Sequence, residues 1–111
     1  MIVAAWKNHT GYDPTGNGYG LIVSKADRDQ YFLKEHQFAL IELEGEHAII
    51  QVNTNKKTFW GDSCRELISK SIGVWLIQNH LAPWEKQHPP KLNLMPLGGN
   101  RFKLCQPDKP D

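Results

Sequence analysis

The stretch FALIELEGEHAIIQVN (residues 38–53) is typical of a β-hairpin. Its first seven residues alternate between apolar and polar, which predicts a half-buried strand. We expect Phe38 and Leu40 to face the core, with a change of register at the next residue, while Glu42 and Glu44 face water. The residues EGE then make a tight turn, and HAIIQVN returns as the antiparallel partner.

A second hairpin is expected near the C-terminus. The apolar runs KLNLMPL (91–97) and NRFKLCQ (100–106) flank Gly98-Gly99. Glycine supplies the positive φ that short hairpin turns need. Three further β-compatible runs are IVAAW, GLIVS and ELIS, at 2–6, 20–24 and 66–69.

Two short helices are also predicted. KADRDQYFL follows Ser24, which stands three residues before Asp27 as in a capping box, and Tyr31 and Phe32 would turn inward. A second helix over about 72–80 would be capped by Ser71. Ile72, Trp75, Leu76 and Asn79 lie at i, i+3, i+4 and i+7 on one face, and three of these four residues are apolar. The following APWEKQHPP cannot be regular helix or a central strand.

These elements predict a mainly β fold with two short helices. Because the hairpins imply mostly antiparallel pairing, we expect a seven-stranded open pseudobarrel whose ends the helices plug. A single domain would cover residues 1–106, followed by a flexible tail over 107–111. Core positions are assigned to Trp6, Trp75 and Phe102, and a partly buried cover to Trp84.

The composition limits the classes of function. A formal net charge of +1 excludes a chain that binds polyanions merely by being very basic, but it allows a local basic surface. Acids outnumber bases over residues 26–46, whereas residues 53–70 carry an excess of bases. The two cysteines, Cys64 and Cys105, are typical of reduced intracellular thiols, although one disulfide stays open. With no basic, apolar leader and no apolar run long enough to span a bilayer, we expect a cytoplasmic protein without membrane contact.

Signatures of catalysis and of metal binding are missing from the sequence. ELE, EGE and WEK lack the spacing of a nuclease acid-x-Lys motif. The five histidines show no zinc-ligand spacing, and GNGYG is not followed by the Lys-Ser/Thr of a phosphate-binding loop. We therefore expect no catalytic residue, no metal and no cofactor, and the chain is not interpreted as an enzyme.

Two long polar loops remain, at 7–19 and 53–65. Their asparagines and lysines suit base edges and phosphates, and their glycines allow the backbone to come close to a duplex. Composition alone leaves open that these are ordinary surface loops.

The order of residues along the chain, from about 4 to 104, resembles the plant B-three DNA-binding domain. Lys7, Thr10 and Asp13 follow that family's Lys-x-x-Thr-x-x-Asp stretch, which precedes an apolar strand and a short helix ending in an aromatic residue, here Phe32. Further residues in matching order are Phe59, Trp60, Ser63, Leu67, Trp75, Asn79 and Leu81. In the plant domains the second helix is usually followed by Gly-Asp, whereas this chain has APWEKQHPP at that place. The proline-rich link is similar to that of the bacterial DNA-recognition domains of restriction endonucleases of the EcoRII and BfiI type. This favours a prokaryotic origin.

The resemblance implies a pseudobarrel that grips the DNA major groove with two arms, one after the first strand and one after the fourth. The matching segments are the same two loops. We therefore expect sequence-specific binding of double-stranded DNA by a nucleoid-associated monomer. It would act as the specificity module of a restriction or defence system, with a nuclease subunit or domain as a further partner, or as a small regulator.

The candidate DNA-binding residues fall into four groups. Phosphate contacts are expected from Lys7, Lys56, Lys57 and Arg65. Contacts to bases or backbone are expected from Asn8, Thr10, Asn17, Asn53, Asn55 and Ser63. Contacts to sugars or bases are expected from Tyr12, Tyr19 and Trp60, the last of which is equally suited to anchor its arm. Asp13 either accepts from a cytosine amino group or stabilises its arm.

Two other interpretations stay open. The same arms suit a protein-binding module, such as a partner or inhibitor in a phage or defence context, and the near-neutral charge favours this somewhat. A related small barrel can also read modified bases or RNA, in which case an aromatic pocket is expected.

Overall fold

The computed structural model describes residues 1–8, 12–62 and 65–107. Its elements in chain order are β1 (Ile2–Lys7), β2 (Tyr19–Ile22), α1 (Lys25–Tyr31), β3 (Phe38–Leu43), β4 (Ile49–Asn53), β5 (Glu66–Ile68), α2 (Lys70–Gln78), β6 (Lys91–Gly98) and β7 (Arg101–Cys105). Cys64 and residues 108–111 of the expected tail lie outside the described ranges.

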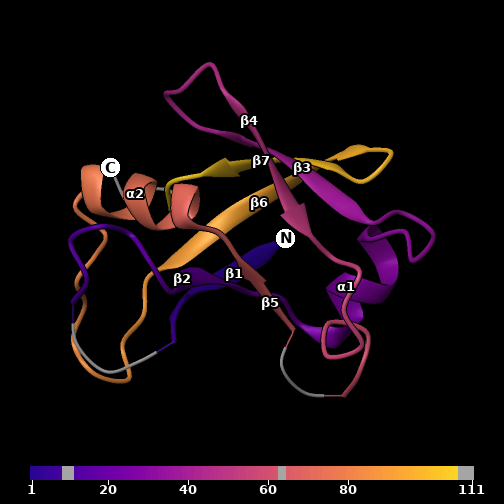
Figure 1. Ribbon diagram of the computed structural model, residues 1–111, viewed down its shortest axis with the longest axis horizontal. Coiled ribbons are helices and arrows are strands. Elements are labelled where there is room, and N and C mark those ends of the chain that lie inside the picture. The colour runs from indigo at the N-terminus through magenta and orange to yellow at the C-terminus, as the bar shows by residue number, and fades with distance from the viewer. Residues whose placement is uncertain (9–11, 63–64, 108–111) are drawn as a thin grey trace.

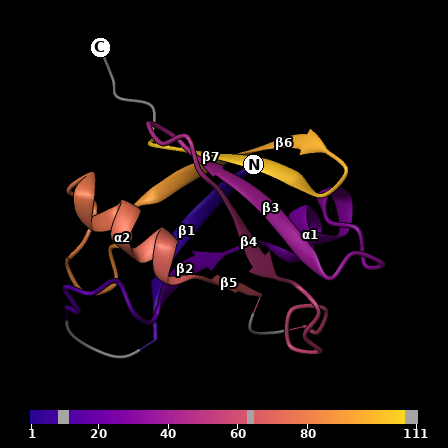
Figure 2. The same cartoon turned by 45° about the horizontal axis from the view of Figure 1, so that its top comes forward.

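The strands form one sheet of seven, in the order β4-β3-β7-β6-β1-β2-β5. Every neighbouring pair is antiparallel except β3 and β7, which run parallel. The sheet curls until its two edge strands, β4 and β5, come close, so the barrel is nearly closed (Figures 1 and 2). The two helices lie at opposite ends of the long axis (Figure 1). The predicted seven-stranded, mostly antiparallel pseudobarrel is confirmed.

Both predicted hairpins form, but each differs in detail from the prediction. In β3 the buried residues are Ala39, Ile41 and Leu43, and Phe38 is 45% exposed, so the inward orientation predicted for Phe38 and Leu40 was wrong. The reason is register: Ile41 and Leu43 lie opposite buried residues of β7, which fixes that face as the inner one. The β6–β7 turn is Gly99-Asn100, one residue later than expected, with φ of 62° and 63°. Positive φ at both central residues is typical of a type I′ turn.

The helices start and end slightly differently from the prediction. The Ser24 hydroxyl caps α1 as expected, accepting from the Asp27 amide at 3.1 Å. Helix α2 begins at Lys70, earlier than expected, so Ser71 lies inside the helix and Ser69 precedes it. No helix in the described ranges is both long and apolar enough to cross a bilayer.

Three of the four tryptophan and phenylalanine assignments hold. Trp75 and Phe102 are buried in the core, and Trp84 is partly buried with its ring edge-on to Tyr19 at 5.9 Å. Trp6 is only half-buried, so its core assignment was wrong. Because Val3 and Ala5 point inward, alternation along β1 turns Trp6 to the outer face.

Candidate nucleic-acid interface

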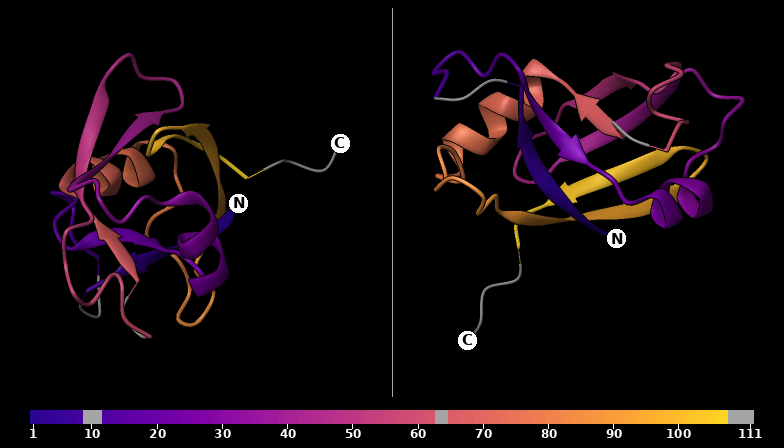
Figure 3. Two further views of the ribbon diagram at one scale, coloured as in Figure 1. Left: turned by 90° about the vertical axis from the view of Figure 1, so that its right-hand side faces the viewer. Right: turned by 90° about the horizontal axis from the view of Figure 1, so that it is seen from below.

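The two polar loops leave the barrel at opposite ends of β2. We call residues 8–18, between β1 and β2, the N-terminal arm, and residues 54–65, between β4 and β5, the second arm. The N-terminal arm runs directly into Tyr19, and the second arm ends beside Ile22, which pairs with Glu66. The described parts of both arms lie on the same side of the barrel (Figures 1 and 3). Three rises of about 3.3 Å along β2 separate Tyr19 from Ile22 by about 10 Å, so the C-terminal ends of the two arms join the barrel about this far apart.

The described part of the N-terminal arm is an ordered turn centred on Asp13. The Asp13 carboxylate accepts from the Thr15 amide at 2.8 Å and from the Thr15 hydroxyl at 2.6 Å. At the root of the arm the Asn8 amide donates to the Gly18 carbonyl at 2.8 Å. The bonds from Thr15, and then the positive charges of Lys7 and Lys70, hold the pKa of Asp13 below its ordinary value. These bonds favour the arm-stabilising role for Asp13 over a contact to cytosine.

This arm packs against α2 through two glycines. A Cβ on Gly73 would collide with the backbone carbonyl of Gly16. A Cβ on Gly16, whose φ is +84°, would lie 2.8 Å from the backbone nitrogen of Val74. The absence of side chains at both positions therefore allows the arm backbone to lie directly on the helix.

The second arm is held by an aromatic residue and a buried arginine. Phe59 is fully buried, and the Trp60 indole N–H donates to the Thr54 carbonyl at 2.9 Å. Arg28, 3% exposed, donates from Nη1 to the Phe59 carbonyl at 2.8 Å and to the Gly61 carbonyl at 2.5 Å. The bond from Trp60 to Thr54 lies within the arm, and the partly buried Trp60 ring packs against the core, which favours the anchoring role over a contact to DNA.

Arg65 is also bound to backbone. Its Nε donates to the Val23 carbonyl at 2.9 Å, and its Nη1 donates to the Asp62 carbonyl at 2.6 Å. Lys25 forms an exposed ion pair with Asp62 at 2.9 Å, and this bond lowers the pKa of the Asp62 carboxyl. Arg65 thus fixes the end of the second arm and has fewer donors left for phosphate than the sequence suggested.

A basic pocket of about 320 Å³ lies at the second arm. It is lined by Asn55, Trp60 and the lysines 34, 56 and 57. None of these lysines forms an ion pair with another described residue, although Lys56 donates to the Glu66 carbonyl at 3.2 Å. Three ammonium groups without a carboxylate in the lining favour an anion such as phosphate.

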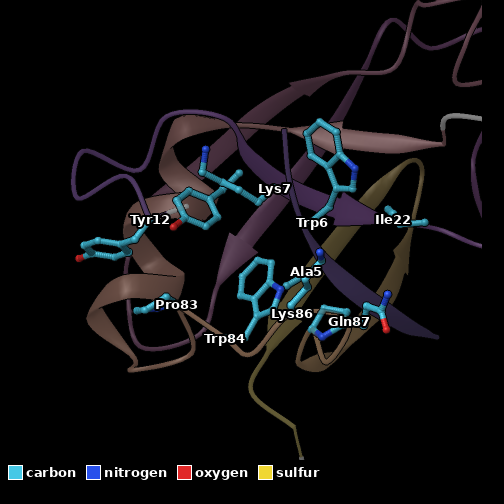
Figure 4. A pocket seen from close by; sticks show the side chains of 11 residues that line it. Ala5, Trp6, Lys7, Tyr12, Ile22, Pro83, Trp84, Lys86 and Gln87 are labelled. Carbon is cyan, nitrogen blue, oxygen red and sulfur yellow. The ribbon is translucent and has the colours of Figure 1, made fainter. Parts of the chain in front are cut away.

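A larger, aromatic pocket of about 650 Å³ lies at the root of the N-terminal arm (Figure 4). Its walls come from β1, β2, the arm itself and the proline-rich segment before β6. Its aromatic and basic lining residues are Trp6, Lys7, Tyr12, Tyr19, Trp84 and Lys86.

The structure divides the predicted site residues by accessibility. Exposed residues are Asn8, Tyr12, Asn17, Asn53, Asn55 and Lys57. Half-buried residues are Lys7, Asp13, Lys56, Trp60 and Arg65. Tyr19 is 2% exposed in the core, so its ring is not available to stack on a base. Thr10 and Ser63 lie outside the described residues.

Sequence reasoning missed several residues at these sites. Lys34 lines the basic pocket, and Trp6, Trp84 and Lys86 line the aromatic one. In IVAAW every residue but the alanines is a large apolar one, so alternation could not tell which face Trp6 takes. Within the described ranges, no group of three or more His, Cys, Asp or Glu residues is placed to hold a metal ion.

The chain matches no protein-family model, no curated protein sequence and no solved structure.

Proposed function

We propose that this protein binds double-stranded DNA, inserting the N-terminal arm and the second arm into the major groove. The observation that carries the proposal is the placement of both arms on one side of the barrel, with their C-terminal ends about 10 Å apart along β2. That spacing is close to the major-groove width of roughly 12 Å. The resemblance to B-three and EcoRII- or BfiI-type domains supports the same arrangement, because those arms also follow the first and fourth strands.

Charge on the arms supports the proposal further. Lys7, Lys56 and Lys57 form no ion pair with other described residues, so their ammonium groups are available for phosphates. The exposed amides of Asn17 and Asn55 suit the edge of adenine, which presents one acceptor and one donor. Asn53 is less available because its side-chain Oδ1 accepts from the backbone N–H of Asn55 at 2.9 Å.

A salt titration with a charge-matched control tests the proposal. The protein is first used to select duplexes from a random oligonucleotide pool, and affinity is then measured by fluorescence anisotropy at several salt concentrations. Lys56→Ala with Lys57→Ala should weaken binding and reduce the slope of log affinity against log salt by about 1.8, at about 0.9 per phosphate contact. Arg101→Ala with Lys103→Ala removes the same charge from β7, away from the arms, and should leave the slope unchanged.

The base contacts are tested separately. Asn17→Ala or Asn55→Ala should relax preference at particular base pairs rather than weaken all duplexes equally. If Lys56→Ala with Lys57→Ala keeps the parent's affinity and salt slope, the second arm does not contact the duplex and the two-arm proposal is wrong. If the parent selects no duplex and instead retains one protein stoichiometrically, the arms serve a protein partner.

We further propose, on the resemblance alone, that the domain is a monomeric, nucleoid-associated specificity module that works with a nuclease subunit or domain, or a small regulator.

A further inference from the structure

The aromatic pocket is built from segments that are distant in sequence. Trp6 comes from β1, Tyr12 from the N-terminal arm, and Trp84 from the proline-rich segment (Figure 4). Tyr19 forms part of the wall and packs edge-on against Trp84, with ring centroids 5.9 Å apart, which fixes the orientation of the indole. A volume of about 650 Å³ falls within the range of small-molecule sites.

The tryptophans of this pocket differ from the other two in their hydrogen bonds. The indole N–H of Trp60 donates to Thr54, and that of Trp75 donates to the Glu44 carbonyl at 2.9 Å. The indole N–H groups of Trp6 and Trp84 have no acceptor among the described residues, although both rings are half-buried. No buried side-chain nitrogen or oxygen of the described residues lacks a partner, so these two N–H groups are open to solvent and can donate to a ligand with acceptors.

The charge of the lining narrows the ligand class. Lys7 and Lys86 line the pocket, and none of its lining residues is an aspartate or a glutamate. The Lys7 ammonium lies 5.1 Å from the centre of the Tyr19 ring and forms no ion pair with a described residue. Aromatic faces beside uncompensated cations suit a nucleotide, whose base stacks and whose phosphate carries negative charge. A proline-rich peptide also binds aromatic grooves, but it would leave the two lysines without a partner.

We propose that the aromatic pocket receives a single nucleobase extruded from the bound duplex, with Lys7 and Lys86 on its flanking phosphates. The proposal rests on the proposed function, because the pocket lies at the root of the arm that would enter the groove. Extrusion requires a base pair to open, and this is least costly at a mismatch. The protein should therefore bind some mismatched duplexes more tightly than the fully matched duplex of the same sequence.

A mismatch scan tests the pocket independently of the groove contacts. A selected duplex is rebuilt with one mismatch at each position in turn, and affinities are compared by anisotropy. At one position, the mismatch should tighten binding about tenfold, the order expected for stacking one base on aromatic rings. Mismatches at the other positions should weaken binding.

Three variants identify the source of this gain. Trp84→Ala should abolish it, so that the ratio of mismatched to matched affinity measured for this variant falls to one or below. Tyr12→Ala should reduce it, and because Tyr12 is 48% exposed this variant should fold even if Trp84→Ala does not. Phe38→Ala removes an exposed ring from β3, outside the pocket, and should keep the full gain.

The outcomes separate the two proposals. Matched-duplex binding without tightening at any position overturns the base pocket alone. If no duplex binds at all, the groove proposal fails. The pocket is then tested with deoxynucleoside monophosphates, which should quench tryptophan emission in the parent and not in Trp84→Ala. Quenching by a proline decapeptide, with none by the nucleotides, would assign the pocket to a peptide and overturn the inference.

Discussion

The two arms are attached to the barrel in opposite ways. The N-terminal arm touches α2 where side chains are missing, with the Gly16 carbonyl lying against Gly73. The second arm is fixed by side chains, since Phe59 enters the core and Arg28 binds two of the arm's carbonyl groups. One attachment depends on close backbone contact and the other on burial and hydrogen bonds.

This difference matters for how each arm would fail. A backbone contact made possible by glycine is lost when any side chain is added, whereas a hydrogen-bonded anchor is lost when a side chain is removed. Both kinds of attachment hold a polar loop at a fixed place on the barrel. This lowers the conformational entropy that the loop loses when it binds a partner. The arms are therefore better described as positioned elements than as free loops, and each attachment can be broken separately.

The largest effect is expected for Arg28→Ala. The substitution leaves the Phe59 and Gly61 carbonyls without their charged donor and removes the guanidinium that lies 5.5 Å from the Trp60 ring. Hydrogen bonds to charged groups contribute about 1.5–3 kcal/mol each, so we expect a loss of about 3 kcal/mol in the free energy of unfolding, measured by urea denaturation. Arg101→Ala, at an exposed arginine, should change it by less than about 0.5 kcal/mol.

Limited proteolysis tests whether the effect of Arg28→Ala is confined to the second arm. In Arg28→Ala, limited digestion under native conditions should cut first within the second arm, while the N-terminal arm keeps the parent's rate of cleavage. Equal acceleration in both arms would mean that the two attachments are not independent.

The next effect in size is expected for Gly73→Ala. Alanine favours a helix over glycine by about 1 kcal/mol, so propensity alone predicts stabilisation. The new methyl group would collide with the Gly16 carbonyl, and overpacking costs about 1–3 kcal/mol, so we expect net destabilisation and faster cleavage of the N-terminal arm. Ser71→Ala, at an exposed position of the same helix, should be neutral or slightly stabilising. A stabilised Gly73→Ala would show that the arm does not depend on this contact.

Much of the scaffold could be predicted from the sequence because local signals determine it. Alternation and turn glycines were enough for the hairpins, and the Ser24 cap was enough for α1. The phase of β3 was not predictable, since Phe38 and Ile41 are both apolar and only the pairing with β7 decides which one is buried.

The arms were located correctly by composition, but their attachments were not found. Arg28 lies in KADRDQY, which looks like a solvated helix, and only the fold brings its guanidinium under the second arm. Gly16 and Gly73 are far apart along the chain, and nothing in the sequence around either glycine indicates that the two are in contact. The aromatic pocket was missed for the same reason: Trp6 and Trp84 line one pocket only when the proline-rich segment folds back beside β1.

The smallest effect concerns one surface carboxylate on each arm. The pKa of Asp13 is lowered mainly by its bonds from Thr15, and the pKa of Asp62 is lowered mainly by Lys25. A carboxyl whose pKa is lower in the folded state stabilises that state above its ordinary pKa of about 3.9, and the stabilisation is lost as the pH falls through the lowered value.

Asp13→Asn and Asp62→Asn should therefore each be slightly less stable than the parent at pH 7, and the differences should shrink as the pH falls below about 4. Urea denaturation at pH 7 and pH 3 measures both. Because the Asp62 partner is a charge whereas the chief Asp13 partners are a hydroxyl and an amide, high salt at pH 7 should reduce the effect of Asp62→Asn and leave most of that of Asp13→Asn. An equal salt dependence would mean that Lys7 and Lys70, rather than Thr15, hold the N-terminal arm in its turn.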